Sequence, residues 1–216
     1  MARRTKEDAL ATRNTLLDAA ECLFQTQGVS RTTLQQIALR AGTTRGAVYW
    51  HFKDKADLFN AMMERITLPL EAHFNAESGP DEKNGATRIG ALDRTRHAIG
   101  MALHQIVNDL QTRRVLEVAT QKVEYVEEHK TIRLRHLAVR NGFLGRVQQG
   151  LDAAAQHDNL TLSLPSAMAA QGLHALVDGL IQNWLLDPQA FDLVQAGQCT
   201  MDVYFTGLGF HIQGGD

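Results

Sequence analysis

The chain has 216 residues, of which 44% are hydrophobic and 21% charged, and its formal net charge is −2. This composition is typical of a globular protein and excludes an intrinsically disordered one. Because it has no run of about 18 apolar residues and its N-terminus is basic and polar, we expect a cytoplasmic protein with no membrane contact. We expect Cys22 and Cys199 to be reduced thiols, although the sequence leaves a disulfide between them open.

The charge is unevenly distributed along the chain. Residues 1–56 contain nine Lys or Arg against five Asp or Glu, whereas residues 57–216 contain 13 against 19. A basic N-terminal segment beside an acidic body suits a protein whose smaller end meets a phosphate backbone, and chance clustering is the alternative. We expect a domain boundary here, with one domain at 1–56 and another at 57–216.

The first expected helix covers about residues 8–27. Its apolar stripe has helical spacing, and Gly28 supplies the residue that ends it. The stripe consists of Leu16, Leu17, Ala20, Leu23 and Phe24. We expect this helix to support the segment that follows.

Residues 33–55 predict a helix-turn-helix. Thr33 and Gln36 have the spacing of a capping box, and Gly42 suits the positive φ of a helix end. Thr43 or Thr44 then caps a second helix of about residues 44–50. Two helices joined by a short turn with Gly form the pattern that places the second helix in a DNA major groove. The alternative is a pair of packed helices in any all-α protein.

The residue types on this segment favour DNA. Arg45 suits a guanine or a phosphate, Tyr49 offers a hydroxyl, and Gly46 permits close backbone approach. Lys55 begins the following helix, whose first amides favour a phosphate. The predicted DNA contacts are Thr33, Thr44, Arg45, Gly46, Tyr49, Trp50, His51 and Lys55.

The first 60 or so residues resemble the DNA-binding domain of the TetR family of repressors. The resemblance is carried by T-R-N-T-L-L-D-A-A (12–20), F-Q-T-Q-G-V (24–29), T-T-L-Q-Q-I-A (32–38), A-G-T-T-R-G-A-V-Y-W-H-F-K-D-K (41–55) and L-F (58–59). The opening M-A-R-R-T-K-E-D-A is similar to the subgroup that represses multidrug-efflux pump operons. The resemblance implies double-stranded operator DNA as a partner.

The remainder of the chain predicts further helices and no strand, which gives an all-α fold of about nine helices. Pro69 either bends or ends the helix that begins near Asp54. A turn-rich loop is expected at 75–91. The later helices are expected at about 88–110, 112–121, 131–156, 165–186 and 191–210.

The last two expected helices are apolar on more than one side. Such helices are buried on all sides, either within a monomer or in a four-helix bundle between two subunits. Because a two-fold operator requires a two-fold protein, we expect a homodimer. The predicted interface residues are Leu180, Trp184, Tyr204 and Phe205.

Two further segments, 112–125 and 182–193, resemble the efflux-repressor subgroup. The resemblance implies an apolar cavity among the fifth to eighth helices for a small amphipathic inducer. The implied lining is Ile99, Ala102, Leu103, Leu116, Glu117, Thr120, Asn141, Leu144, His174, Val177, Asp178 and Gln182. Thr120 and His174 stand where close relatives carry a His and an aromatic residue. Glu117 and Asp178 either meet a cationic drug or make structural hydrogen bonds.

The implied function is repression of a multidrug-efflux operon, relieved by amphipathic or aromatic molecules. The alternatives are a TetR-type regulator of a metabolic operon and a ligand-independent DNA-binding protein. Motifs of metalloproteases, α/β-hydrolases, P-loop and dinucleotide-binding proteins are absent from the sequence. The pairs His97/His104 and His129/His136 lack a third metal ligand nearby. We therefore expect neither enzyme activity nor a metal or other cofactor.

Overall fold

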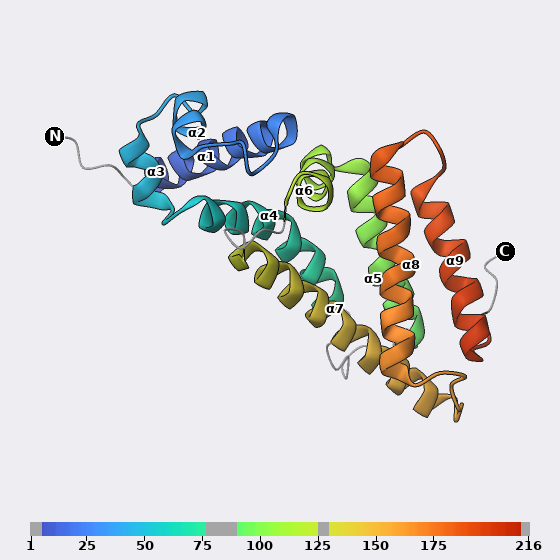
Figure 1. The fold of residues 1–216 in the computed structure, drawn as a ribbon. Helices are drawn as coiled ribbons and strands as arrows, with labels where there is room; N and C mark the ends of the chain where they lie inside the picture. Colours follow the sequence, from blue (N-terminus) through green and yellow to red (C-terminus); the bar gives the residue numbers. More distant parts are fainter. Residues whose placement is uncertain (1–5, 77–89, 125–129, 213–216) are drawn as a thin grey trace. The chain divides into compact units, whose positions relative to one another are not determined.

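A computed structural model of the chain describes residues 6–76, 90–124 and 130–212 (Figure 1). These residues form nine helices and no strand, which confirms the predicted all-α fold. The helices are α1 (Lys6–Gln27), α2 (Leu34–Arg40), α3 (Arg45–His51), α4 (Lys55–Ala76), α5 (Ala91–Asn108), α6 (Leu110–Gln121), α7 (Lys130–His157), α8 (Ser166–Leu186) and α9 (Leu193–Leu208).

Every expected helix is present, with ends that differ from the prediction by a few residues. The largest difference concerns α4, which continues through Pro69 to Ala76 and therefore does not end at the proline. The expected loop at 75–91 falls almost entirely outside the described residues.

The chain forms two compact units. One comprises residues 1–68 with 111–137, and the other comprises residues 69–110 with 138–216. This division differs from the predicted boundary after residue 56, because α6 and the first part of α7 pack with the N-terminal helices. Both α4 and α7 run from one unit into the other.

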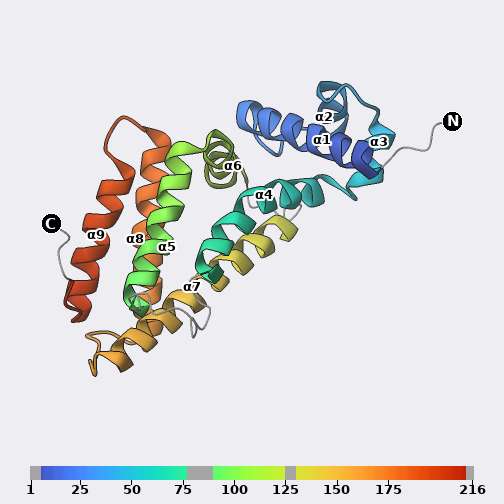
Figure 2. The same cartoon turned by 180° about the vertical axis from the view of Figure 1, so that it is seen from behind.

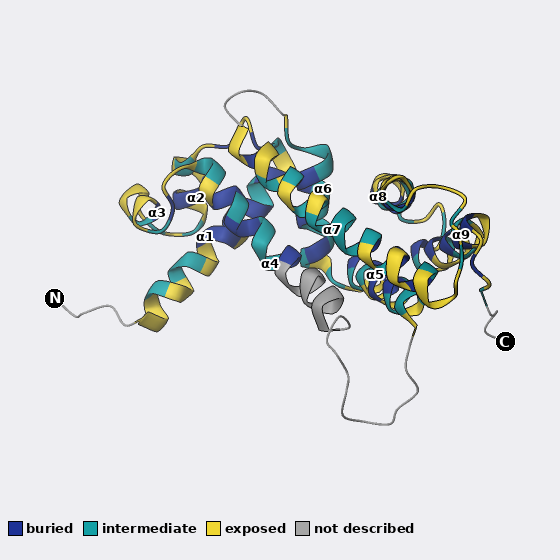
Figure 3. Ribbon diagram, turned by 90° about the horizontal axis from the view of Figure 1, so that it is seen from below, coloured by how far each residue is buried: buried dark blue, intermediate teal, exposed yellow. Residues whose placement is uncertain are grey.

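The N-terminal unit has an apolar core that α1, α4 and α6 share with the two short helices. Phe24, Ile37, Val48, Leu58 and Val118 are each fully buried in it. Figure 3 colours the buried segments of the helices dark blue. The short helices α2 and α3 contribute one or two buried side chains each, so most of their surface remains for other contacts.

An ion-pair network ties α4 to α1 within this unit. The Arg65 guanidinium lies 2.6 Å from the Asp18 carboxylate and 2.8 Å from that of the buried Glu21. Gln111 at the start of α6 donates a further hydrogen bond of 3.0 Å to Glu21. A buried carboxylate needs such partners, and here they join three helices.

In the C-terminal unit, α9 packs against both α5 and α8, and the three helices run side by side in both views (Figures 1 and 2). A Cβ at Gly172 would meet the Tyr204 side chain, and one at Gly197 would meet Leu103. These two glycines therefore allow α9 to approach both neighbours closely. The Tyr204 hydroxyl donates to the Ala169 carbonyl at 2.8 Å, and burial raises the pKa of Tyr204.

Two sequence expectations concern the whole chain. Cys22 and Cys199 are both free thiols, as predicted. Across the three described ranges, no helix combines the length and apolar character that crossing a membrane requires.

Candidate nucleic-acid interface and ligand sites

Helix α2 begins with the predicted capping box. The Thr33 hydroxyl accepts a hydrogen bond of 3.2 Å from the Gln36 amide, and the Gln36 side chain accepts one of 2.8 Å from the Thr33 amide. Gly42 has a φ of +64° in the turn after α2, a value that suits glycine. Thr33 is thus placed as a cap, and its hydroxyl is engaged within its own chain.

Helix α3 is capped and anchored on one side. The Thr44 hydroxyl accepts a hydrogen bond of 3.2 Å from the Ala47 amide, and Val48 is fully buried beneath the helix. The opposite side presents Arg45, Gly46 and Tyr49 to solvent, as the sequence predicted. A short helix held in this way offers polar groups at fixed positions.

Arg45 and Tyr49 form a pair on this exposed side. The Arg45 guanidinium donates a hydrogen bond of 3.0 Å to the Tyr49 hydroxyl, and its carbon lies 5.4 Å from the centre of the Tyr49 ring. A guanidinium has five N–H donors, so most of them stay available for a phosphate or a guanine edge. The pair restricts the Arg45 side chain before any partner binds.

Two aromatic residues at the end of α3 differ in exposure. Trp50 is 70% exposed and follows the 49% exposed Tyr49. His51 is half-buried, with its ring edge-on to Trp50 at 4.5 Å between ring centroids. His51 is therefore less available to DNA than the sequence suggested.

Lys55 has a different role from the one predicted. Its ammonium donates hydrogen bonds to the carbonyls of Val29 at 2.8 Å, Thr32 at 3.1 Å and Ser30 at 3.3 Å. These carbonyls belong to the turn between α1 and α2. The three hydrogen bonds stabilise that turn. Because an ammonium has three N–H donors, all of them are used in these bonds.

Three predicted inducer contacts lie on α6 in the N-terminal unit. The Glu117 carboxylate accepts a hydrogen bond of 2.8 Å from Gln25 on α1 and lies 4.0 Å from Lys122. The Thr120 hydroxyl donates to the Leu116 carbonyl at 2.8 Å. Of the two alternatives for Glu117, a drug contact or a structural hydrogen bond, these contacts support the second. Both of its partners belong to its own unit.

The other nine predicted inducer contacts lie in the C-terminal unit. Among them, Ile99, Leu103 and Val177 are buried, and Asp178 accepts a hydrogen bond from the Gln182 side chain. Exposed positions are Asn141 and Gln182, and the half-buried ones are Ala102, Leu144, His174 and Asp178. Because the twelve residues divide between two units, the cavity that they would line stays a prediction.

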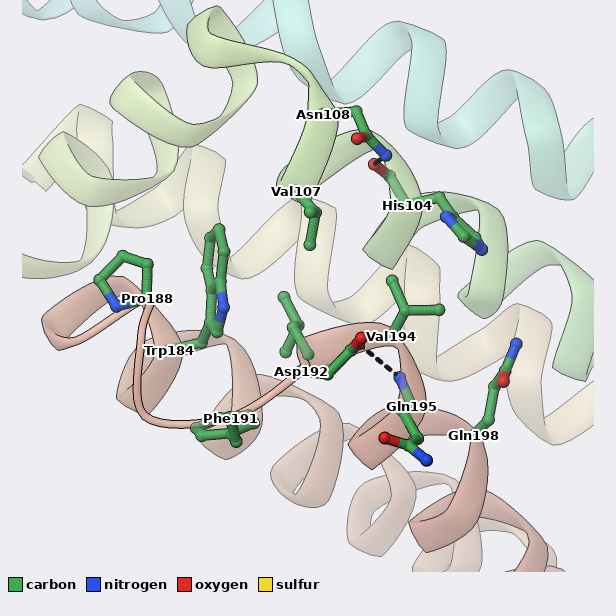
Figure 4. Close-up of a pocket in the computed structure, with 11 residues that line it drawn as sticks. His104, Val107, Asn108, Trp184, Pro188, Phe191, Asp192, Val194, Gln195 and Gln198 are labelled. Atoms are coloured by element: carbon green, nitrogen blue, oxygen red, sulfur yellow. Dashed lines mark hydrogen bonds between the residues drawn. The ribbon is translucent and has the colours of Figure 1, made fainter.

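A pocket that the sequence did not indicate lies in the C-terminal unit (Figure 4). It has a volume of about 600 Å³. Its lining consists of His104, Val107, Asn108, Trp184, Pro188, Phe191, Asp192, Leu193, Val194, Gln195 and Gln198. None of the twelve predicted inducer contacts lines it. The lining residues come from two stretches that are far apart in the chain, 104–108 and 184–198, so no local spacing in the sequence could have revealed the pocket.

The predicted dimer interface also stays a prediction, although the structure changes which side chains suit it. Phe205 is fully buried and Trp184 is 4% exposed within a single chain, so neither has surface left for a partner. Leu180 and Tyr204 are half-buried. Large apolar surface on α8 and α9 is instead provided by Met168, 58% exposed, and Val203, 74% exposed.

Comparison with known protein families finds a match at each end of the chain. Residues 16–62 match the model of bacterial regulatory proteins of the tetR family. Residues 91–210 match the C-terminal region of MAATS-type transcriptional repressors. Among individual proteins, the HTH-type transcriptional regulator TtgR of Pseudomonas putida is 36% identical over 195 residues, which is 90% of each protein.

Two solved structures have the same fold over nearly the whole chain. NalD, the secondary repressor of the MexAB-OprM multidrug efflux pump in Pseudomonas aeruginosa, is 34% identical with a TM-score of 0.82. The match covers 94% of this chain and 98% of NalD. SmeT in complex with triclosan is 30% identical with a TM-score of 0.77, and the match covers 91% and 90% of the two chains. SmeT is the repressor of the Stenotrophomonas maltophilia multidrug efflux pump SmeDEF.

Proposed function

Because this chain belongs to the tetR family of bacterial regulatory proteins, we propose that it represses a multidrug-efflux pump operon. It binds operator DNA as a homodimer and is released by a small amphipathic molecule in its C-terminal unit. The proposal draws on relatives such as NalD and SmeT, which repress efflux pumps and match this chain over more than nine-tenths of its length.

The observation that carries the proposal is the exposed side of α3. Arg45 and Tyr49 are paired there, Thr44 caps the helix, and Val48 anchors it to the unit. Helices α1 and α2 support α3 from the opposite side. This arrangement suits insertion of α3 into a major groove, with Arg45 directed to a base or a phosphate.

Dimerisation through α8 and α9 is part of the proposal. Met168 and Val203 carry large exposed apolar surfaces on these helices. Burying such surfaces between two copies removes them from water, which favours association. A two-fold dimer also presents two copies of α3 to the two halves of an operator.

An aromatic inducer fits the C-terminal unit. Ile99, Leu103 and Val177 supply buried apolar surface on α5 and α8, and His174 lies edge-on to Phe143 with 5.5 Å between ring centroids. Apolar walls with a few polar groups favour amphipathic ligands. Triclosan, which SmeT binds, is therefore the first compound to test.

The test is a gel-shift titration on the DNA directly upstream of the gene. The protein should bind this DNA in preference to a shuffled sequence, and the affinity should fall steeply with salt as phosphate contacts release counterions. Addition of triclosan should release the complex. Equal affinity for the shuffled DNA would contradict the proposed repressor role, and an unaffected complex would contradict induction by this compound.

A further inference from the structure

The C-terminal end of α6 is hydrogen-bonded to the end of α1 and to the turn that follows it, residues 28–32. The Gln25 side chain donates to the Glu117 carboxylate at 2.8 Å. The Ser30 hydroxyl donates to the Glu124 carboxylate at 3.2 Å. The partners are 92 and 94 residues apart in the sequence. These bonds therefore join α6 to the segment that leads into the helix-turn-helix.

A backbone hydrogen bond lies between these two side-chain bonds. The Val29 amide donates to the Lys122 carbonyl at 3.1 Å, and Val29 is fully buried. Lys122 directly follows the last residue of α6, so its carbonyl is one of those that a helix end leaves without a partner inside the helix. A buried backbone amide needs a partner. The end of α6 supplies that partner to the turn.

The same turn is hydrogen-bonded onward to α2 and α4. The Thr32 hydroxyl donates to the Gly28 carbonyl at 2.7 Å and accepts a bond of 3.0 Å from the Gln27 side chain. Gln27 also donates at 3.3 Å to Gln36, which belongs to the capping box of α2. The Lys55 ammonium at the start of α4 binds three carbonyls of the turn. The position of the turn is thus linked to the position of α2, which packs against α3.

The chain also joins α6 directly to a helix of the C-terminal unit. A single residue, Asp109, separates α5 from α6. Helix α5 belongs to the C-terminal unit and carries Ile99 and Leu103 of the implied inducer lining. A displacement of α5 therefore reaches the N-terminal unit through one residue, and the 12-residue helix α6 carries it as a rigid element to the turn.

We propose that the C-terminal end of α6 positions the helix-turn-helix, with Glu117 as a positioning residue. The bonds to Gln25 and Val29 hold the turn, and through it α2 and α3, in the arrangement that binds DNA. An inducer that shifts α5, and with it α6, weakens these bonds and releases the turn. The positioning rests on the contacts within the N-terminal unit, whereas the step driven by an inducer rests on the proposed function.

Hydrogen–deuterium exchange tests the positioning without DNA or ligand. Gln25→Met removes the donor to Glu117, so the amides of residues 28–40 should exchange at least about fivefold faster through more frequent local opening. Gln25→Lys keeps a donor and should retain slow exchange. Thr26→Ala is the matched control, because the exposed Thr26 hydroxyl bonds only within α1. Unchanged exchange in Gln25→Met, or an equal increase in Thr26→Ala or in α9, would overturn the positioning.

An operator titration with and without triclosan tests the step driven by an inducer. Gln25→Met should weaken operator binding about threefold or more without triclosan, and the factor by which triclosan weakens it further should shrink towards one. Thr26→Ala should keep both values of the unmodified protein. An undiminished triclosan factor in Gln25→Met would overturn the route through α6. An unmodified protein that does not respond to triclosan would refute the proposed induction instead, and the exchange rates would still decide the positioning.

Discussion

Arg45 is the side chain on which the proposed operator recognition most depends. It lies on the exposed side of α3, with its guanidinium held by the Tyr49 hydroxyl. The sequence alone indicated that both residues face outward, because Val48 and Ala47 are the apolar positions of the helix. The hydrogen bond between them follows from their spacing of four residues, which places side chains next to each other on a helix.

Arg45→Ala should weaken operator binding and leave the fold intact. Loss of one good base contact costs about 1–3 kcal/mol in each half-site, which is roughly a fivefold to 150-fold loss of affinity per half-site. A dimer carries the substitution in both half-sites, so the two losses multiply. Fluorescence anisotropy with labelled operator measures the affinity, and circular dichroism checks the helix content. Arg133→Ala removes an exposed Arg from α7 and is the matched control. If both variants bind like the unmodified protein, α3 is not the helix that reads the operator.

The structure gives the Lys55 ammonium contacts that the sequence did not indicate. A Lys at a helix start suits a phosphate, and the sequence does not reveal that three carbonyls from residues 29–32 lie within its reach. Such contacts between distant segments depend on the packing of α4 against the turn after α1. They are visible only once the fold is known.

Lys55→Met should destabilise the N-terminal unit. It leaves the Thr32 carbonyl without its donor, whereas the Val29 carbonyl keeps the Thr32 amide as a partner. An unsatisfied buried group costs about 1–3 kcal/mol. Lys53→Met, at an exposed position two residues earlier, should have little effect. Urea denaturation followed by circular dichroism gives the free energy of unfolding for each variant. Equal stability of the two variants would show that the Lys55 hydrogen bonds contribute nothing.

The short helices α2 and α3 were predictable because their signals are local. The capping box of Thr33 and Gln36, the turn at Gly42 and the cap at Thr44 each involve residues within four positions of each other. The grouping of α6 with the N-terminal helices was not predictable. It depends on contacts such as the one between Gln25 and Glu117, which are 92 residues apart.

The close approach of α9 to α8 depends on Gly172. A Cβ at this position would clash with the Tyr204 hydroxyl, which donates to the Ala169 carbonyl. Gly172→Ala should therefore reduce the free energy of unfolding by about 1–3 kcal/mol through overpacking. Gly145→Ala on α7 is the matched control, because a Cβ there meets nothing within 4 Å.

The two glycine substitutions should change stability in opposite directions. Replacing Gly by Ala inside an unobstructed helix stabilises it by about 0.5–1 kcal/mol, which is the expected result for Gly145. Thermal unfolding of both variants provides the comparison. A stabilised Gly172 variant would mean that Tyr204 moves aside without cost and that the close packing of α8 and α9 does not require glycine.

Assembly of the whole molecule should depend on the exposed apolar surface of α9. Val203→Asp places a charge at a position that is 74% exposed in one chain, and so should not disturb the monomer fold. If two copies associate there, the buried charge is costly and the variant should be monomeric at micromolar concentration. Light scattering measures the mass. Leu134→Asp, at a 54% exposed position on α7, is the control and should remain dimeric.

A dimeric Val203→Asp variant of unchanged stability would place the subunit contact elsewhere. The substitution is more informative than one at Trp184 or Phe205. Both of these side chains are buried within one chain, so a charge there would disturb the fold whether or not a dimer forms. Exposure in the single chain is thus the property that separates interface residues from core residues, and the apolar pattern of the sequence cannot make that distinction.

Induction requires that ligand binding in the C-terminal unit weakens operator binding at α3, and that operator binding weakens ligand binding. Helices α4 and α7 run through both units and are the continuous elements through which such coupling can act. A ligand shifts the equilibrium only as far as its affinities for the two states differ. A tenfold relief of repression corresponds to about 1.4 kcal/mol of coupling, and linkage makes that coupling reciprocal.

Isothermal titration of triclosan into the free protein and into the operator complex measures this coupling most directly. The account predicts that triclosan binds the operator complex more weakly than the free protein. The factor should equal the one by which triclosan weakens operator binding in a separate DNA titration. Equal triclosan affinity for the free and operator-bound protein would contradict ligand-induced release from DNA.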